Sequence, residues 1–202
     1  PSGIADSASA SRDSRVRRIL EPGGFDQVEH EGLHGCSPPF LPLGSRPDVL
    51  VFQTDPLEDD LEVTGPIEVK LWVKSSAVDT DFTAKLIDVY PPSRWYPRGY
   101  ALNLSDSIMR LRYRKGPEAA DFLPPGEIDQ VTITLYPTSN LFARGHRLRL
   151  DISSSNFPRF DVNPNTGEPI GRDRLRAAAD NTVFHDSERS SQIILPIISS
   201  GD

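Results

Sequence analysis

The sequence predicts an all-β protein built as a two-sheet β-sandwich or jelly roll, with long loops and at most one short helix. Nineteen prolines and fourteen glycines in 202 residues interrupt the chain too often for long helices. Several segments alternate apolar and polar side chains with the period of two that a β-strand requires. These segments, about nine in all, follow one another at short spacing, which is typical of two packed β-sheets.

The chain is expected to contain a short polar segment and one domain. Residues 1–18 are rich in Ser, Ala, Asp and Arg and are interpreted as a linker or a fragment boundary. Residues 19–202 then form one β-sandwich. Within this domain, residues 25–46 are expected to form a loop over the surface, because their prolines exclude helix and regular central strand.

The strongest strand signal lies between residues 65 and 91, in two arms. In the first arm, alternate residues are apolar and share one strand face: Ile67, Val69, Leu71 and Val73. The second arm, 81–90, is also rich in apolar and β-branched residues. The connection at 75–80 is longer than a two-residue hairpin, so the arms either pair in one sheet or bridge two sheets. Two strands alone are not stable, so a second layer must cover them.

The remaining elements are shorter. Further strands are expected at 48–54, 102–103, 108–114, 127–136, 147–153, 182–185 and 192–198, and residues 61–64 lead into the first arm. The run at 48–54 is almost continuously apolar and is therefore expected to be buried on both faces. In 147–153, Leu148, Leu150 and Ile152 point inward. Residues 173–180 are the one segment with a helical signal, about two turns long.

The residues do not assemble a catalytic site by their spacing. No G-x-S-x-G nucleophile elbow is present in the sequence. Cys36 has His34 two residues away, but that spacing alone does not make a catalytic dyad. His185 and Asp186 are adjacent, so on a strand they would point to opposite faces. We therefore assign no catalytic residue and expect the chain alone to hydrolyse nothing.

Metal binding has one weak candidate. The four histidines lack the spacing of a zinc site. Asp161, Asn163 and Asn165 match the first three ligand positions of an EF-hand loop, but Thr166 and Arg172 stand where glycine and glutamate are required. Turns stabilised by Asn and Asp side chains are the favoured interpretation, and a calcium site of another design at 161–172 stays open. No metal or cofactor is assigned.

Two exposed features have both a functional and a structural interpretation. Arg110, Arg112 and Arg114 alternate on an expected strand, where they either bind a phosphate or acidic partner or form a solvated outer face paired with residues such as Glu68. The second feature is a pair of loop aromatics. These residues are Trp95 and Tyr96. They either stack on a sugar, as in a carbohydrate-binding β-sandwich module, or fill the end of the sandwich or a domain interface.

Charge and hydropathy exclude some partners. The formal net charge of −7 gives no general attraction to nucleic acid or to an anionic membrane. No run approaches the 18 or so apolar residues that span a bilayer. The first 18 residues lack the apolar core of a signal peptide, and the single Cys36 cannot form an internal disulfide. The expected location is cytoplasmic.

Several stretches together resemble one family. They are RPDVLVFQTDPLEDDLEVTGPIEVKLWVKSSAVDTDFTAKLIDVYP (46–91), IMRLRYR (108–114), TSNLFARGHRLRLDISSSNFPRFDVNPNTG (138–167) and HDSERSSQIILPII (185–198). In this order they resemble the C-terminal non-catalytic domain of the X-prolyl dipeptidyl-peptidase and cocaine esterase (CocE/NonD) family of serine hydrolases. The resemblance covers nearly everything after about residue 16, and the proline-rich loop at 91–100 departs from it.

The resemblance implies a jelly-roll, galactose-binding-like β-sandwich whose partner is an α/β-hydrolase catalytic domain of the same parent chain. The Ser-Asp-His triad of such enzymes, which act on esters, amides or X-prolyl peptides, belongs to that catalytic domain and maps onto no residue of 1–202. The segment entering the jelly roll lies near the cleft between the domains, so Ile19 and Leu20 are candidates for lining the acyl side of the substrate pocket. Support of homo-oligomer contacts is a further expectation.

Overall fold

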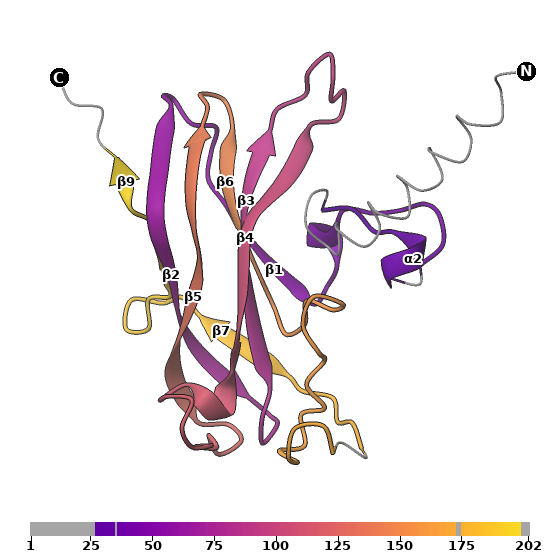
Figure 1. Cartoon of the computed structure of the whole chain (residues 1–202), viewed down its shortest axis with the longest axis vertical. Helices are drawn as coiled ribbons and strands as arrows, with labels where there is room; N and C mark the ends of the chain where they lie inside the picture. Colours follow the sequence, from indigo (N-terminus) through magenta and orange to yellow (C-terminus); the bar gives the residue numbers. More distant parts are fainter. Residues whose placement is uncertain (1–26, 35, 173–174, 199–202) are drawn as a thin grey trace, which may run out of the picture.

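The computed structural model describes residues 27–34, 36–172 and 175–198, which form two packed antiparallel sheets (Figure 1). The first sheet has the order β1 (Val49–Gln53), β6 (Arg147–Ser153), β3 (Asp81–Tyr90) and β4 (Tyr100–Arg110). The second sheet consists of β5 (Ile128–Phe142), β2 (Leu61–Ser75), β7 (Asn181–Phe184), β8 (Gln192–Ile194) and β9 (Ile197–Ile198). The two arms of the strongest strand signal therefore bridge the two sheets.

The order of the strands is that of a jelly roll. β7, β8 and β9 pair with successive stretches of β2, at 72–75, 68–70 and 62–63, and so act as one interrupted edge strand. The chain crosses between sheets at every connection up to β7 except the β3–β4 hairpin. This alternation over seven strand positions matches the double Greek key of a jelly roll. The predicted fold class is confirmed.

The core forms where alternate residues of the strands face each other across the sandwich. The inward residues of β2 named above are 0–2% exposed. They face Phe82, Ala84 and Leu86 of β3 and the inward residues of β6, which the sequence also placed in the core. The β2–β5 register shifts between Gly65 and Ile67, where Pro66 has no N–H for the ladder. Gly65 takes a φ of +136° there, which a side chain rarely permits.

Three expectations about the elements are wrong. β1 is not buried on both faces: it is the edge strand of the first sheet, and Leu50, Val51 and Phe52 are 36–43% exposed. A continuous apolar run does not distinguish a central strand from an edge strand. The predicted helix at 173–180 is not formed over 175–180, which are irregular. A short helix, α2 (Glu31–His34), instead lies in the predicted loop. No helix of the described residues is long and apolar enough to cross a membrane.

The predicted arginine stripe does not exist, because β4 ends at Arg110 and a 3-10 turn, η2 (Leu111–Tyr113), follows. The three arginines bind aspartates instead of Glu68. Arg110 binds Asp81, Arg112 binds Asp79, and Arg114 binds Asp121 and Asp129. Arg112 is 4% exposed and Asp79 is fully buried, with Nε and Oδ2 2.7 Å apart. These ion pairs tie together the loops at one end of the sandwich.

Asn163 joins the same cluster and explains the Asp/Asn-rich loop. Its side-chain amide donates to Asp79 and Asp81 at 3.1 and 2.8 Å, and its Oδ1 accepts the backbone N–H of Asn165. The loop thus uses Asn163 for a turn and for loop anchoring, which supports the favoured interpretation of this segment. The described residues contain no group of three or more His, Cys, Asp or Glu side chains that could hold a metal ion.

This cluster gives a stability prediction. Asp79 accepts hydrogen bonds from the Arg112 backbone, the Arg112 guanidinium and Asn163. Because Asp79→Ala leaves the buried Arg112 without its counter-charge, we expect the free energy of unfolding to fall by about 3–5 kcal/mol in urea denaturation. Glu68→Ala, which breaks the exposed pair with Lys70, is the control and should leave the midpoint unchanged. Equal midpoints for the two variants would contradict this account of the loop cluster.

Candidate functional site

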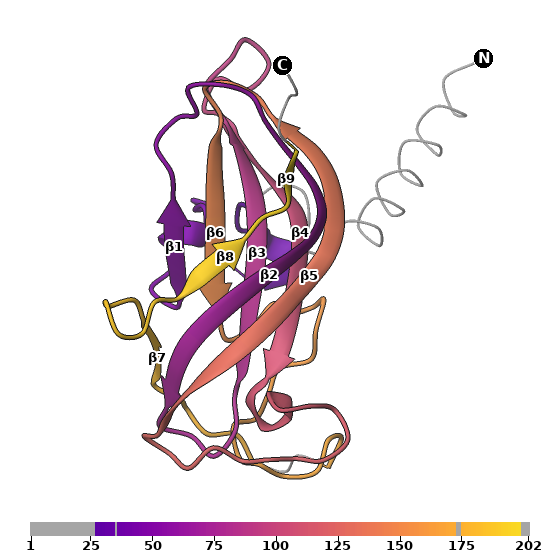
Figure 2. The ribbon, with the colours of Figure 1, turned by 90° about the vertical axis from the view of Figure 1, so that its left-hand side faces the viewer.

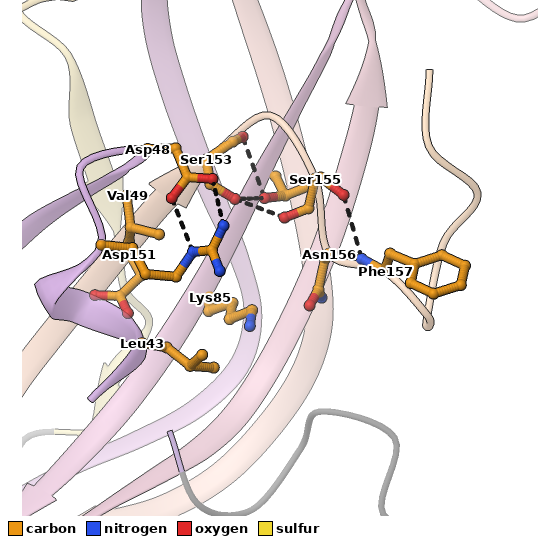
Figure 3. A pocket seen from close by; sticks show the side chains of 11 residues that line it. Leu43, Asp48, Val49, Lys85, Asp151, Ser153, Ser155, Asn156 and Phe157 are labelled. Carbon is orange, nitrogen blue, oxygen red and sulfur yellow. Dashed lines mark hydrogen bonds and ion pairs between the residues drawn. The ribbon is translucent and has the colours of Figure 1, made fainter. Parts of the chain in front are cut away.

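A polar cavity of about 220 Å³ lies on the outer face of the first sheet (Figure 3). Its lining comes from β1, β3 and β6 and from the segments before β1 and after β6. The lining residues are Leu43, Arg46, Asp48, Val49, Thr83, Lys85, Asp151, Ser153, Ser155, Asn156 and Phe157. Figure 3 shows Lys85 in the middle of this group, with Phe157 on the side opposite to Val49 and Asp48. We call it the Lys85 cavity.

Strand alternation places these polar side chains on the outside. Because Ala84 and Leu86 face the core, Lys85 must point to the outer face of β3. The register puts Lys85 directly opposite Asp151 of β6 on one side and Asp106 of β4 on the other. Residues paired in this way have Cβ atoms about 4.5–5.5 Å apart, close enough for opposite charges to interact.

Arginines bind the carboxylates around the cavity. Arg149 makes two hydrogen bonds to Asp151, at 2.7 and 2.6 Å. Asp106 is bound by Arg159, with Nε and Oδ1 2.6 Å apart. At the rim, the Arg46 guanidinium donates two hydrogen bonds to Asp48 and holds the pKa of that carboxyl below its usual range.

Lys85 has a different environment from these arginines. Its Nζ donates to Oε1 of Gln27, a residue 1% exposed, at 3.3 Å. Burial lowers the pKa of Lys85, and the nearby charges of Asp106 and Asp151 oppose that shift. Around the cavity, four basic side chains therefore face three carboxylates. The three arginines bind these carboxylates, whereas the described hydrogen bond of Lys85 goes to the neutral amide of Gln27.

The polar groups of the cavity are suited to recognition of a polar partner. The hydroxyl oxygens of Thr83 and Ser153 lie 2.9 Å apart, and the Ser153 hydroxyl donates to the Ser155 carbonyl at 2.7 Å. No histidine or cysteine lines the cavity to act as base or nucleophile. What the lining offers is a half-buried lysine, hydroxyls and an amide beside an exposed aromatic ring, Phe157.

The structure does not bring the predicted site residues together. Ile19 and Leu20 lie outside the described residues. Trp95 and Tyr96 lie on the β3–β4 loop and are 75% and 43% exposed. The Tyr96 ring stacks on Tyr100, with centroids 4.8 Å apart, so that face is already covered. The three main cavities of the described residues are lined by other side chains.

The adjacent residues His185 and Asp186 make separate contacts in the structure. The His185 ring packs edge-on against Phe52, with centroids 5.7 Å apart. Asp186 accepts the backbone N–H groups of Glu188 and Arg189 and so stabilises a turn after β7. The adjacent His and Asp thus serve packing and turn formation.

The chain belongs to the family of X-Pro dipeptidyl-peptidase C-terminal non-catalytic domains, whose model matches residues 7–194. Cocaine esterase from Rhodococcus sp. (strain MB1 Bresler) is 46% identical over 159 residues, which are 78% of this chain and 27% of the esterase. The resemblance that the sequence motifs indicated is confirmed.

Solved structures of hydrolases also resemble this chain. An aminopeptidase from the marine sediment archaeon Thaumarchaeota archaeon matches with a TM-score of 0.73 and 35% identity, over 78% of this chain and 27% of the aminopeptidase. An α-amino acid ester hydrolase matches with a TM-score of 0.73 and 34% identity, over 77% and 26% of the two chains. The chain thus spans about a quarter of the length of these hydrolases.

The lowered pKa of Lys85 gives a pH prediction. Because the pKa of Lys85 is lower in the folded chain than its usual 10.5, the lysine loses its proton at a lower pH in the folded state than in the unfolded state. The cost of burying the charged lysine therefore decreases as the pH rises towards 10.5. Relative to a Lys85→Met variant, the wild-type free energy of unfolding should therefore increase between pH 7 and pH 10. Urea denaturation of both proteins at several pH values measures this difference. A difference that stays constant with pH would contradict the assignment.

Proposed function

We propose that this chain is the non-catalytic β-sandwich of a serine hydrolase acting on esters, amides or X-prolyl peptides. It packs against the α/β-hydrolase domain of its parent chain and completes one wall of the substrate cleft. Family membership and the mutual resemblance to an esterase, an aminopeptidase and an ester hydrolase support the class of the parent. The parent would supply acyl-enzyme chemistry and an oxyanion hole from residues outside 1–202.

The observation that carries the docking proposal is the burial of charge on an outer sheet face. Asp106 and Asp151 are 4% exposed and Arg149 is 9% exposed, although strand alternation points them away from the core. Gln27 and the segments at 43–48 and 155–159 already cover part of this face. A sheet face prepared in this way resembles an interface that excludes water, not a solvated surface.

Exposed apolar side chains border the same face. Phe40 and Leu41, on the proline-rich segment that leads to the cavity, are 40% and 50% exposed, and Phe157 at the cavity rim is 56% exposed. An apolar rim beside buried polar groups is the surface that a missing partner would leave bare. Ile19 and Leu20 precede Gln27 by less than ten residues and remain our candidates for the acyl side of the cleft.

The alternative function, a carbohydrate-binding module, lacks a supporting observation. A sugar platform needs a concave site with free aromatic faces. The Arg94 guanidinium lies over the Trp95 ring, 4.6 Å from its centroid, and Tyr96 stacks on Tyr100 and contacts Tyr90. We therefore do not carry this alternative further.

The docking proposal is tested in the full-length parent enzyme. Phe157→Asp places a charge at the apolar rim, so we expect kcat/KM for an ester or X-prolyl substrate to fall roughly tenfold or more, as for the loss of a central interface aromatic. The matched control is Trp95→Asp, another exposed aromatic on a different loop, which should retain wild-type kinetics. Wild-type kinetics in both variants, or an equal loss in both, would contradict docking through the Lys85 cavity face.

A further inference from the structure

A second cavity, an apolar groove of about 380 Å³, opens where the edges of the two sheets separate. Its apolar lining includes Phe52, Leu71, Leu86, Leu148, Leu150 and Ile193. Figure 2 views the second sheet from outside: β8 lies to the left of β2, and β1 of the far sheet extends beyond β8. We call this cavity the edge groove.

The edge groove is an uncovered part of the protein interior. Leu71 and Leu86 belong to the hydrophobic core, and Leu148 and Leu150, at 9% each, are the most exposed members of that core in the described residues. Phe52, on the neighbouring edge strand, is 36% exposed. Apolar surface of this kind is costly to leave in contact with water.

Topology explains why the groove is open. An eight-stranded jelly roll has two Greek keys, whereas the described strands fill seven positions. The first sheet has four, and the second has three: β5, β2, and the edge made by β7, β8 and β9. Within the described residues, β7, β8 and β9 pair with β2 alone, so no described strand lies along their outer edge. The vacant eighth position is beside that edge, over β1 and β6.

We propose that a β-strand from the parent chain outside residues 1–202 occupies the edge groove. It pairs with the free edge of β7–β9 and inserts alternate apolar side chains between Phe52, Leu148 and Ile193. Backbone pairing would provide affinity and the apolar pocket would provide register, as in other strand additions to a sheet edge. The proposal rests on the parent chain being longer, and not on where the catalytic domain docks.

Two other occupants fit less well. The large apolar side chains of residues 1–26 are Ile4, Val16, Ile19, Leu20 and Phe25. No two of them are two positions apart, so this segment lacks the alternating large apolar residues of a half-buried strand. A second copy of this chain would have to offer an exposed strand with that alternation. The relatives, by contrast, are about four times as long as the matched region, so a parent chain has ample sequence to supply the strand.

Site-directed photo-crosslinking in the full-length parent identifies the occupant. Phe52 is replaced by p-benzoylphenylalanine, and the crosslinked peptide is identified by mass spectrometry. The expected product joins Phe52→p-benzoylphenylalanine to one extended segment outside 1–202 with alternating apolar residues. The control is the same replacement at Ile194, which is 42% exposed and alternates with the groove-lining Ile193, so it should not capture that segment. Crosslinks to residues 1–26, to a second copy, or to nothing would overturn the proposal.

Hydrogen exchange tests the same proposal without any substitution, in case the protein with p-benzoylphenylalanine at Phe52 does not fold. In the unmodified parent, peptides covering 192–198 should exchange at least tenfold more slowly than in the 202-residue chain. β5, the opposite edge of the same sheet, provides the internal control, because strand addition at β7–β9 leaves its edge unchanged. Equal exchange at 192–198 in the two proteins would overturn the proposal. Loss of docking at the Lys85 cavity would not alter this readout, so the two proposals fail separately.

Discussion

Burial of the inward face of β2 is the interaction on which the other parts of the structure depend. This strand holds β5 along one side and the three short strands β7, β8 and β9 along the other. Ile67, Val69, Leu71 and Val73 are almost completely buried, and each contributes about 1.5–3 kcal/mol. Together they match the net stability of a typical domain, about 5–15 kcal/mol. The short C-terminal strands are held in place because β2 is fixed by this burial.

The same alternation that builds the core fills the opposite face of the first sheet with charge. On β3 and β6, Leu86 and Leu150 point inward while Lys85 and Asp151 point outward, and yet Asp151 is buried and Lys85 is half-buried. Buried ion pairs contribute little net stability compared with apolar residues of the same size. We propose that their presence on this face serves recognition of a partner with complementary groups. On this proposal, one face of the first sheet makes the core and the other docks against the catalytic domain.

Alternation and turn residues predicted most of the fold. They located the strand faces of 67–73 and 147–153 and the turn at Asn163, but not the contacts of Asn163 with Asp79 and Asp81. They failed where two structures share one pattern: the apolar run at 48–54 fits a central or an edge strand, and Arg110, Arg112 and Arg114 alternate although a 3-10 turn ends the strand. The Lys85 cavity was missed because its members come from distant strands. The outward charges of 147–153 were the available signal, but their partners depend on strand register.

The central claim is that the face around the Lys85 cavity is covered in the parent enzyme by its catalytic domain. Hydroxyl-radical footprinting of the full-length parent and of the 202-residue chain tests this directly, because Phe40, Leu41 and Phe157 are all exposed in the chain. The account predicts that these three side chains are oxidised in the chain and protected in the parent, while Trp95 reacts equally in both. Equal oxidation of the three side chains in the two proteins would contradict it.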